Sequence, residues 1–204
     1  MGFRTSLLEK GSRVYCVEPN DDMRRTAETD LSEFDNFISV NAPAENTGLQ
    51  DRSCDFVTAA TAFHWFDKDK FPPECRRIIK NDAKVVLVWN IRDYERKIIK
   101  KDFVIREKYG VVLRGLAAIL RIAEDLPRFF TGGSCEIKTF RNDVPVDRET
   151  YLSMNLSRSY SPKENENPEK YNAFVKELNA LFDDYQVHGL IVFPQITKSY
   201  VGMV

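Results

Sequence analysis

Short apolar runs alternate with amphipathic stretches through the first half of the chain. Apolar runs without a helical period predict strands, whereas apolar residues spaced three and four apart predict helices. The pattern predicts strands at residues 13–17, 37–40, 54–60 and 84–89, with helices at 3–10, at 67–80 and after residue 20.

The ends of the first two helices are marked by residues that favour helix termini. Gly11 is placed to end the first helix, and either Asn20 or Asp21 can cap the second. The apolar stripe of the second helix is Met23, Ala27 and Leu31. Because strands and helices alternate and the strands are almost entirely apolar, we predict an α/β fold with a mostly parallel sheet covered by helices on both faces.

The second half of the chain has a different pattern. Residues 93–124 predict helix, interrupted at Gly110 and ended by Pro127, without an intervening strand. A strand at 136–141 and a short helix capped by Asp147 follow. Residues 157–168 predict a loop, and 169–185 form the clearest amphipathic helix. The apolar runs 190–193 and 196–204 predict a closing hairpin or one long bent strand of the sheet, with Pro194 at a bulge or an edge.

Composition narrows the class of protein further. The chain has 204 residues, of which 43% are hydrophobic, enough for the core of one domain. With 30 basic and 31 acidic side chains the net charge is -1, which favours neither nucleic acid nor an anionic membrane as partner. No apolar run predicts a membrane span, and the N-terminus does not resemble a signal peptide.

The four cysteines predict no metal site and no disulfide framework. They are Cys16, Cys54, Cys75 and Cys135, and they form neither a CxxC motif nor a cluster with histidine. We therefore expect reduced thiols in a cytoplasmic protein.

The strand at 13–17 ends in an acidic residue, Glu18. In nucleotide-binding α/β folds an acid at this place binds the ribose hydroxyls, and a first strand with a glycine-rich loop precedes it by roughly 20 residues. Only 13 residues stand before residue 14 here, so we predict that the first strand and most of the cofactor loop are missing. The alternative role of Glu18 is to cap the helix that follows.

Several segments in order carry a resemblance to a known family. They are Val17-Glu18-Pro19-Asn20, Ala44-Glu45-Asn46-Thr47-Gly48-Leu49, the run from Asp55 to Phe66 that contains Ala62-Phe63-His64-Trp65, Glu74 to Lys80, and Val85 to Asn90. The ordered set resembles the class I S-adenosylmethionine-dependent methyltransferases, in particular the type 11-like branch that acts on small molecules. The resemblance implies a Rossmann-like sheet with an antiparallel C-terminal strand.

The resemblance also implies a set of residues around the cofactor S-adenosylmethionine. Glu18 would bind the ribose hydroxyls, with Pro19, Asn20 and Met23 beside the sugar and adenine. Ala44 and Glu45 would contact the adenine edge. Thr61, Ala62 and Phe63 would border the reacting methyl group, and Gly2 would stand for the last glycine of the cofactor loop. The alternatives are an ordinary core position for Met23 and a solvated loop acid for Glu45.

Methyl transfer depends mainly on aligning the acceptor with the methyl carbon and sulfur, so few side chains need to take part in the chemistry. His64 is the best candidate for a base, with packing at an apolar edge as the alternative, and Asp93 could also remove a proton. Phe63, Trp65, Asp93 and Tyr94 could line a pocket for a small-molecule acceptor, with surface packing as the alternative.

We expect one methyltransferase-like domain over 1–204. Residues 1–92 would form the cofactor-binding half, 93–133 and 147–188 a helical cover, and 134–142 and 189–204 the closing strands. The truncation leaves three alternatives: a longer natural protein, closure of the gap by neighbouring strands, or a filling element, which a second chain could supply in a homodimer. A non-catalytic remnant is the alternative function. A nicotinamide oxidoreductase shares the acid of Glu18 but does not account for the later segments.

Overall fold

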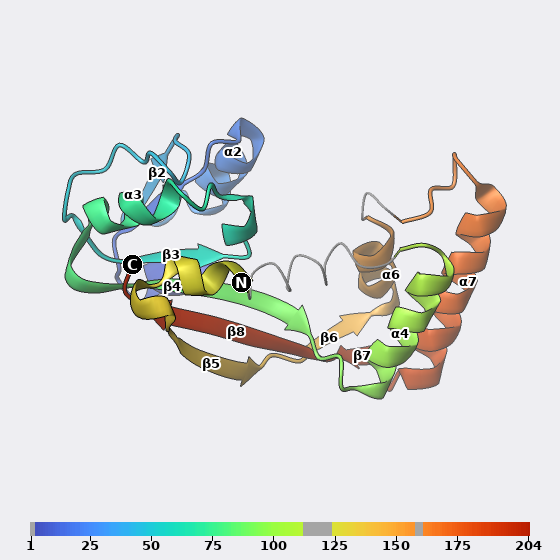
Figure 1. Cartoon of the computed structure of the whole chain (residues 1–204). Helices are drawn as coiled ribbons and strands as arrows, with labels where there is room; N and C mark the ends of the chain where they lie inside the picture. The colour runs from blue at the N-terminus through green and yellow to red at the C-terminus, as the bar shows by residue number, and fades with distance from the viewer. Residues whose placement is uncertain (1–2, 112–123, 158–160) are drawn as a thin grey trace. The chain divides into compact units, whose positions relative to one another are not determined.

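A computed structural model of the chain describes residues 3–111, 124–157 and 161–204. Contacts within the chain divide it into two compact units. Unit 1 comprises Met1–Val88, Ile122–Glu136 and Tyr200–Val204, and unit 2 comprises Trp89–Arg121 and Ile137–Ser199. Figure 1 shows the elements of both, and each unit is described by itself.

Unit 1 begins with a helix and a two-stranded parallel sheet. Helix α1 (Phe3–Glu9) is followed by Gly11, whose positive φ of 81° gives the left-handed conformation that suits a glycine after a helix. Strands β1 (Val14–Val17) and β2 (Phe37–Val40) pair in register, Val14 with Phe37 and Val17 with Val40. Helix α2 (Asp21–Asp30) joins them, and Asn20 caps it by accepting a hydrogen bond from the Met23 amide at 3.0 Å.

A second sheet has the strand order β3-β4-β8-β5. Its strands are β3 (Cys54–Ala60), β4 (Ile79–Arg92), β5 (Glu136–Arg141) and β8 (Gln195–Gly202). Strands β3 and β4 are parallel, and β8 runs opposite to β4 and β5 (Figure 1). The predicted mostly parallel α/β sheet with an antiparallel C-terminal strand is thus confirmed. Among the described residues β1 and β3 belong to separate sheets, so hydrogen bonds between neighbouring strands do not close the predicted gap.

Aromatic side chains form much of the core of unit 1. The short helix η1 (Phe63–Trp65) contributes Phe63, which is fully buried, and helix α3 (Phe71–Ile78) contributes Phe71. The Phe71 and Phe129 rings stack with centroids 5.6 Å apart, and the Phe63 and Phe129 rings lie 4.8 Å apart. The segment around Phe129 therefore belongs to the same core as residues more than fifty positions earlier.

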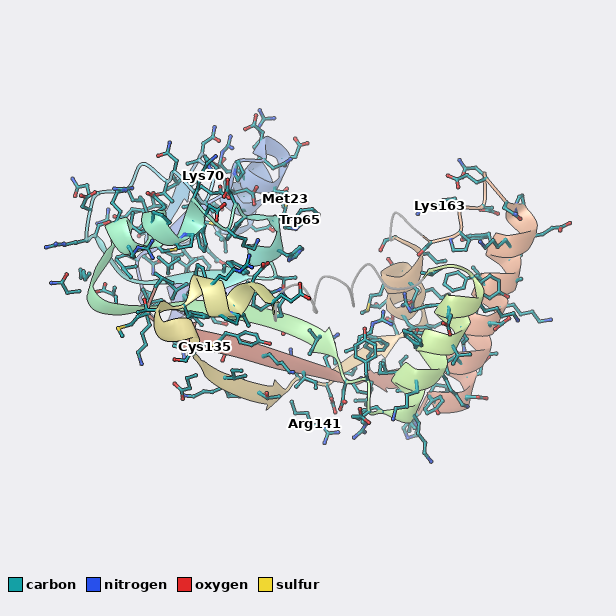
Figure 2. All side chains as sticks on the ribbon, in the orientation of Figure 1. Met23, Trp65, Lys70, Cys135, Arg141 and Lys163 are labelled. Carbon is teal, nitrogen blue, oxygen red and sulfur yellow. The ribbon has the colours of Figure 1, made fainter. Side chains whose placement is uncertain are left out.

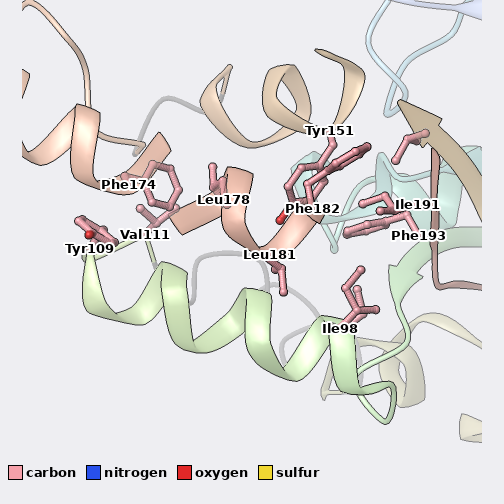
Figure 3. Packing of buried hydrophobic residues seen from close by; sticks show 12 residues of the cluster. Ile98, Tyr109, Val111, Tyr151, Phe174, Leu178, Leu181, Phe182, Ile191 and Phe193 are labelled. Carbon is pink, nitrogen blue, oxygen red and sulfur yellow. The ribbon is translucent and has the colours of Figure 1, made fainter. Parts of the chain in front are cut away.

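The described part of unit 2 contains three helices and a two-stranded antiparallel sheet, together with the end of β4, nearly all of β5 and the first part of β8. The helices are α4 (Lys97–Lys108), α6 (Arg148–Leu156) and α7 (Pro168–Tyr185), and the strands are β6 (Val144–Asp147) and β7 (Leu190–Phe193). Asp147 caps α6, as predicted, and Asn167 caps α7. Figure 3 shows the side chains of α7 between α4 and α6, with Phe174, Leu178 and Phe182 almost fully buried.

Several predicted elements differ from the structure. The helix predicted at 67–80 is shorter, because Ile79 already pairs with Cys54 and begins β4. Of the helix predicted at 93–124, the structure shows α4, after which Gly110 has a φ of 71°, and residues 112–123 lie outside the described part. Residues 124–129 are again helical, so Pro127 lies within a helix and does not end it as predicted.

The closing strands also differ from the expectation. The runs at 190–193 and 196–204 do not share a sheet, because β7 pairs with β6 and β8 belongs to the larger sheet. Strand β6 itself was not predicted. Its sequence, VPVD, is short and contains a proline, which in a sequence pattern speaks against a strand.

Candidate functional site

Glu18 lies at the carboxyl end of β1, inside the turn that leads into α2. Its carboxylate oxygen Oε1 accepts a hydrogen bond from the Asn20 amide at 2.9 Å, and its backbone amide donates to Val40 O at 3.1 Å. The bond to Asn20 supports the turn before α2, whereas the cap of the helix is Asn20 itself. A carboxylate has about four acceptor positions, so this bond leaves capacity for two ribose hydroxyls.

Glu45 connects the loop after β2 with the segment after β3. Its Oε1 accepts a hydrogen bond from the Asp67 amide at 2.7 Å. Together with the backbone bond from Glu18 to Val40, this contact brings the chain that follows β1, β2 and β3 into one neighbourhood of unit 1. The residues predicted to surround the cofactor on these three segments therefore lie in one region.

A buried ion pair anchors the loop that carries Glu45. The Glu74 carboxylate is 7% exposed and accepts hydrogen bonds from the Thr47 amide at 2.8 Å and the Thr47 hydroxyl at 2.5 Å. Arg77 donates to the same carboxylate through Nε and Nη2, both at 2.8 Å. The bonds from Arg77, followed by those from Thr47, lower the pKa of Glu74 to about 2 against the opposing effect of burial.

Thr61, the first residue after β3, has an unfavourable backbone conformation. Its φ is 52°, a left-handed value that is unusual for a β-branched residue. The Thr61 amide is held by a hydrogen bond to Val88 O of 2.8 Å. Strained residues concentrate at functional sites, so this conformation agrees with the predicted position of Thr61 at the reacting end of the sheet.

His64 and Trp65 follow on η1, with ring centroids 4.9 Å apart. His64 Nδ1 is buried and has no hydrogen-bond partner among the described residues. Burial, followed by the positive charge of Lys68, lowers the pKa of His64, which favours the neutral imidazole that a base requires. Trp65 is 81% exposed, and Figure 2 shows it at the outside of its helix.

Lys68 is a residue of this region that the sequence reasoning missed. Its Nζ donates to Phe63 O and to Phe66 O, both at 2.7 Å, and lies 4.5 Å from the centre of the Phe63 ring. Burial lowers the pKa of Lys68. Because Phe63 begins η1 and Phe66 follows its last residue, the two bonds from Lys68 fix the backbone on both sides of His64. No sequence pattern indicates that a single lysine after an aromatic run will bind the backbone in this way.

The remaining predicted site residues have diverse surroundings. Pro19, Asn20 and Met23 are exposed, and Met23 at 63% exposure is not the core residue that the stripe of α2 predicted (Figure 2). Ala44 and Ala62 are half-buried. Gly2 lies outside the described residues, and Asp93 and Tyr94 belong to unit 2.

Within the described part of the chain there is no group of three or more metal-binding side chains, and no helix is both long and apolar enough to cross a membrane. All four cysteines carry free thiols.

Comparison with solved structures identifies the fold. A protein described as a type II methyltransferase from Anaeromyxobacter dehalogenans has a TM-score of 0.62 at 20% identity, covering 98% of this chain and 84% of its own. A protein described as a methyltransferase of an antibiotic biosynthesis pathway in Anabaena variabilis has a TM-score of 0.60, also at 20% identity, covering 98% and 85%. The chain thus has a Rossmann-like methyltransferase fold.

Sequence comparison finds similarity to methyltransferases over the first part of the chain. Residues 2–87 match the profile of a family described as "Methyltransferase domain". An uncharacterized methyltransferase of Mycobacterium tuberculosis is 34% identical over 89 residues, which are 44% of this chain and 35% of that protein. One from Schizosaccharomyces pombe is 37% identical over 157 residues, covering 74% and 60%. Residues 2–87 are thus similar to the methyltransferase family, as the resemblance indicated, and the fold is that of class I methyltransferases. The chain spans about a third of the length of the mycobacterial relative.

Proposed function

We propose that the protein binds S-adenosylmethionine in unit 1 and transfers its methyl group to a small-molecule acceptor. One observation carries the proposal: the segments after β1, β2 and β3, which contain Glu18, Glu45 and Thr61, are joined by hydrogen bonds. Ligands of open α/β sheets bind outside the carboxyl ends of the strands, where these residues lie. The family match over residues 2–87 covers all three segments and supports the same cofactor.

The proposed roles follow from the chemistry of the side chains. Glu18 would accept hydrogen bonds from the two ribose hydroxyls, and the region of Ala44 and Glu45 would meet the adenine edge. The neutral imidazole of His64 would accept a proton from an alcohol or amine acceptor. S-adenosylmethionine supplies an electrophilic methyl group, so the protein has chiefly to orient the acceptor.

Calorimetric titration with S-adenosylhomocysteine, the demethylated form of the cofactor, tests the cofactor site. We expect saturable heat from the wild-type chain and at least about tenfold weaker binding by Glu18→Gln, since a charge-assisted hydrogen bond contributes more than a neutral one. The control is Glu33→Gln, which changes an exposed acid outside the proposed site and leaves the affinity unchanged. Absence of saturable heat at millimolar ligand would reject cofactor binding by this chain.

A methyltransferase-like module without catalysis is the second candidate. The observation that favours it is that Oε1 of Glu18 and Oε1 of Glu45 already accept backbone hydrogen bonds, so both carboxylates have structural roles. The same titration separates the two candidates, because a non-catalytic module with weak or no cofactor binding predicts no saturable heat from the wild-type chain.

A further inference from the structure

A buried ionic group lies among the helices and strands of unit 2. The Asp102 carboxylate of α4 is fully buried and accepts hydrogen bonds from Arg92 Nη1, from Arg106 Nε at 2.7 Å and from the Tyr151 hydroxyl at 3.1 Å. The Arg92 guanidinium also lies 5.0 Å from the centre of the Phe193 ring. One carboxylate is therefore shared by two guanidinium groups in an apolar setting.

Tyr151 does not supply a second negative charge. Burial, followed by the charge of Asp102, raises the pKa of the Tyr151 hydroxyl, which therefore stays protonated and donates to Asp102. Asp102 is the one carboxylate that the described residues place within ion-pair distance of Arg106.

One hydrogen-bond donor of Arg106, the Nη2 group, has no acceptor within the ionic group around Asp102. Its side chain is 7% exposed, and among the described residues no hydrogen-bond acceptor meets its buried Nη2. A buried acceptor is also left over on α6, one helical turn after Tyr151. Asn155 donates through Nδ2 to Tyr151 O at 2.7 Å, but its buried Oδ1 meets no donor in the same set of residues. Buried polar atoms are nearly always paired, and a charged donor is the costliest to leave without a partner.

We propose that Arg106 marks a binding site in unit 2 for one anionic group of a ligand, a carboxylate or a phosphate. A guanidinium presents its N–H groups in a planar fork that matches the oxygens of both anions. Asp102 holds the fork through Nε and leaves Nη2 for the ligand. A hydroxyl or amide donor on the same ligand suits Asn155 Oδ1.

The site is distinct from the proposed cofactor site. Arg106, Asp102 and Tyr151 belong to unit 2 and lie outside residues 2–87, whereas the segments around Glu18 and Glu45 belong to unit 1. Anion binding at Arg106 does not require methyl transfer, so either proposal can fail without the other.

The test is a nuclear magnetic resonance titration of the full chain, labelled with nitrogen-15 in its arginine side chains and free of S-adenosylmethionine. Acetate and inorganic phosphate are added in separate experiments at constant ionic strength, with chloride as reference, and samples are equilibrated because Arg106 is buried. We expect a saturable shift of the Arg106 side-chain resonance with acetate, with phosphate or with both, and no saturation with chloride. Saturation by acetate alone indicates a carboxylate ligand, and by phosphate alone a phosphate.

The variant Arg106→Lys assigns the Arg106 side-chain resonance, which it lacks, and tests whether anion binding needs the planar guanidinium. A lysine keeps the charge but presents a point donor, so we expect at least tenfold weaker anion binding. In both variants binding is followed through the side-chain resonance of Arg92, which shares the Asp102 carboxylate with residue 106. Arg141→Lys is the matched control, because Arg141 is 69% exposed and pairs with Asp143 on the surface. Equal affinities of the two variants would overturn the proposal. The proposal would also be overturned if no arginine resonance of the wild-type chain showed a saturable shift with acetate or phosphate. That result does not depend on whether Arg106→Lys folds.

Discussion

The Glu74 carboxylate holds the loop that carries Ala44 and Glu45 on α3, so its charge should govern the stability of that region. Its pKa is about 2 in the folded protein, below the ordinary 4.5, so its contribution is complete above about pH 4.5 and is lost as the pH falls toward 2. We expect Glu74→Gln to lower the free energy of unfolding at pH 7 by about 2 kcal/mol or more, because it removes charge-assisted hydrogen bonds from Thr47 and Arg77.

Urea unfolding at pH 7 and near pH 3 measures this effect. The difference between wild type and Glu74→Gln should shrink at the lower pH, where wild-type Glu74 begins to take up a proton. Asp55→Asn is a suitable control, because Asp55 pairs with Lys80 on the surface and such pairs contribute little. A difference that stays the same at both pH values would contradict the assigned role of the Glu74 charge.

Thr61 offers a test of backbone strain at the end of β3. Glycine adopts a φ of 52° without the steric cost that a β-branched residue has there, so Thr61→Gly should stabilise the fold by up to about 1 kcal/mol. The same substitution at Thr58, inside β3, should instead destabilise by about 1 kcal/mol. Denaturant unfolding of the two variants is the measurement, and a loss of stability at both positions would show that Thr61 is not strained.

Sequence patterns at the scale of single elements predicted most of the fold. Strands β1, β2 and β3 and helix α7 lie where apolar runs and the helical period indicated them. The end of α3 could not be predicted, because Ile78 and Ile79 suit a helix and a strand equally and only the pairing with Cys54 decides. Periodicity likewise placed Met23 in the core, although its side chain is 63% exposed.

The candidate site was predictable where a strand end fixes the place of a residue, as for Glu18 and Thr61. The ionic group of unit 2 could not be predicted from the sequence. Asp102 and Arg106 are four residues apart on a helix, a spacing typical of an ordinary exposed ion pair. In the folded chain the Asp102 carboxylate contacts the Tyr151 hydroxyl, and Arg92, which also binds Asp102, lies against the Phe193 ring. Tyr151 and Phe193 come from distant parts of the chain. Local patterns carry no information about such contacts.

Strand β8 gives a prediction about packing between elements. A Cβ atom added at Gly202 would lie 2.6 Å from Phe130 Cδ1, closer than real Cβ atoms approach, while the Phe130 side chain is itself buried. We expect Gly202→Ala to destabilise unit 1 by about 1–3 kcal/mol through overpacking. Combining it with Phe130→Leu should cost less than the sum of the single substitutions, because the smaller side chain removes the clash. Additive free energies of unfolding would refute the contact.

At the scale of the whole molecule, the family match and the compact unit have different boundaries. The match ends at residue 87, whereas unit 1 also includes Ile122–Glu136 and Tyr200–Val204. The second of these segments contributes the end of β8, and the first contributes Phe129, which is 4% exposed and contacts Phe63 and Phe71. A fragment of residues 1–92 would therefore expose the rings of Phe63 and Phe71 and the side of β4 that β8 covers.

We accordingly expect residues 1–92, expressed alone, to lack a cooperative unfolding transition, although they contain the whole match to the family. Burial of one large aromatic side chain contributes about 1.5–3 kcal/mol, so losing several such contacts removes much of the roughly 5–15 kcal/mol by which a domain is stable. Thermal unfolding followed by near-ultraviolet circular dichroism compares the fragment with the full chain of 204 residues, in which Phe129 and β8 are present. A fragment that unfolds cooperatively at the same midpoint as the full chain would mean that residues 1–92 fold independently, and that the two later segments add nothing to the stability of unit 1.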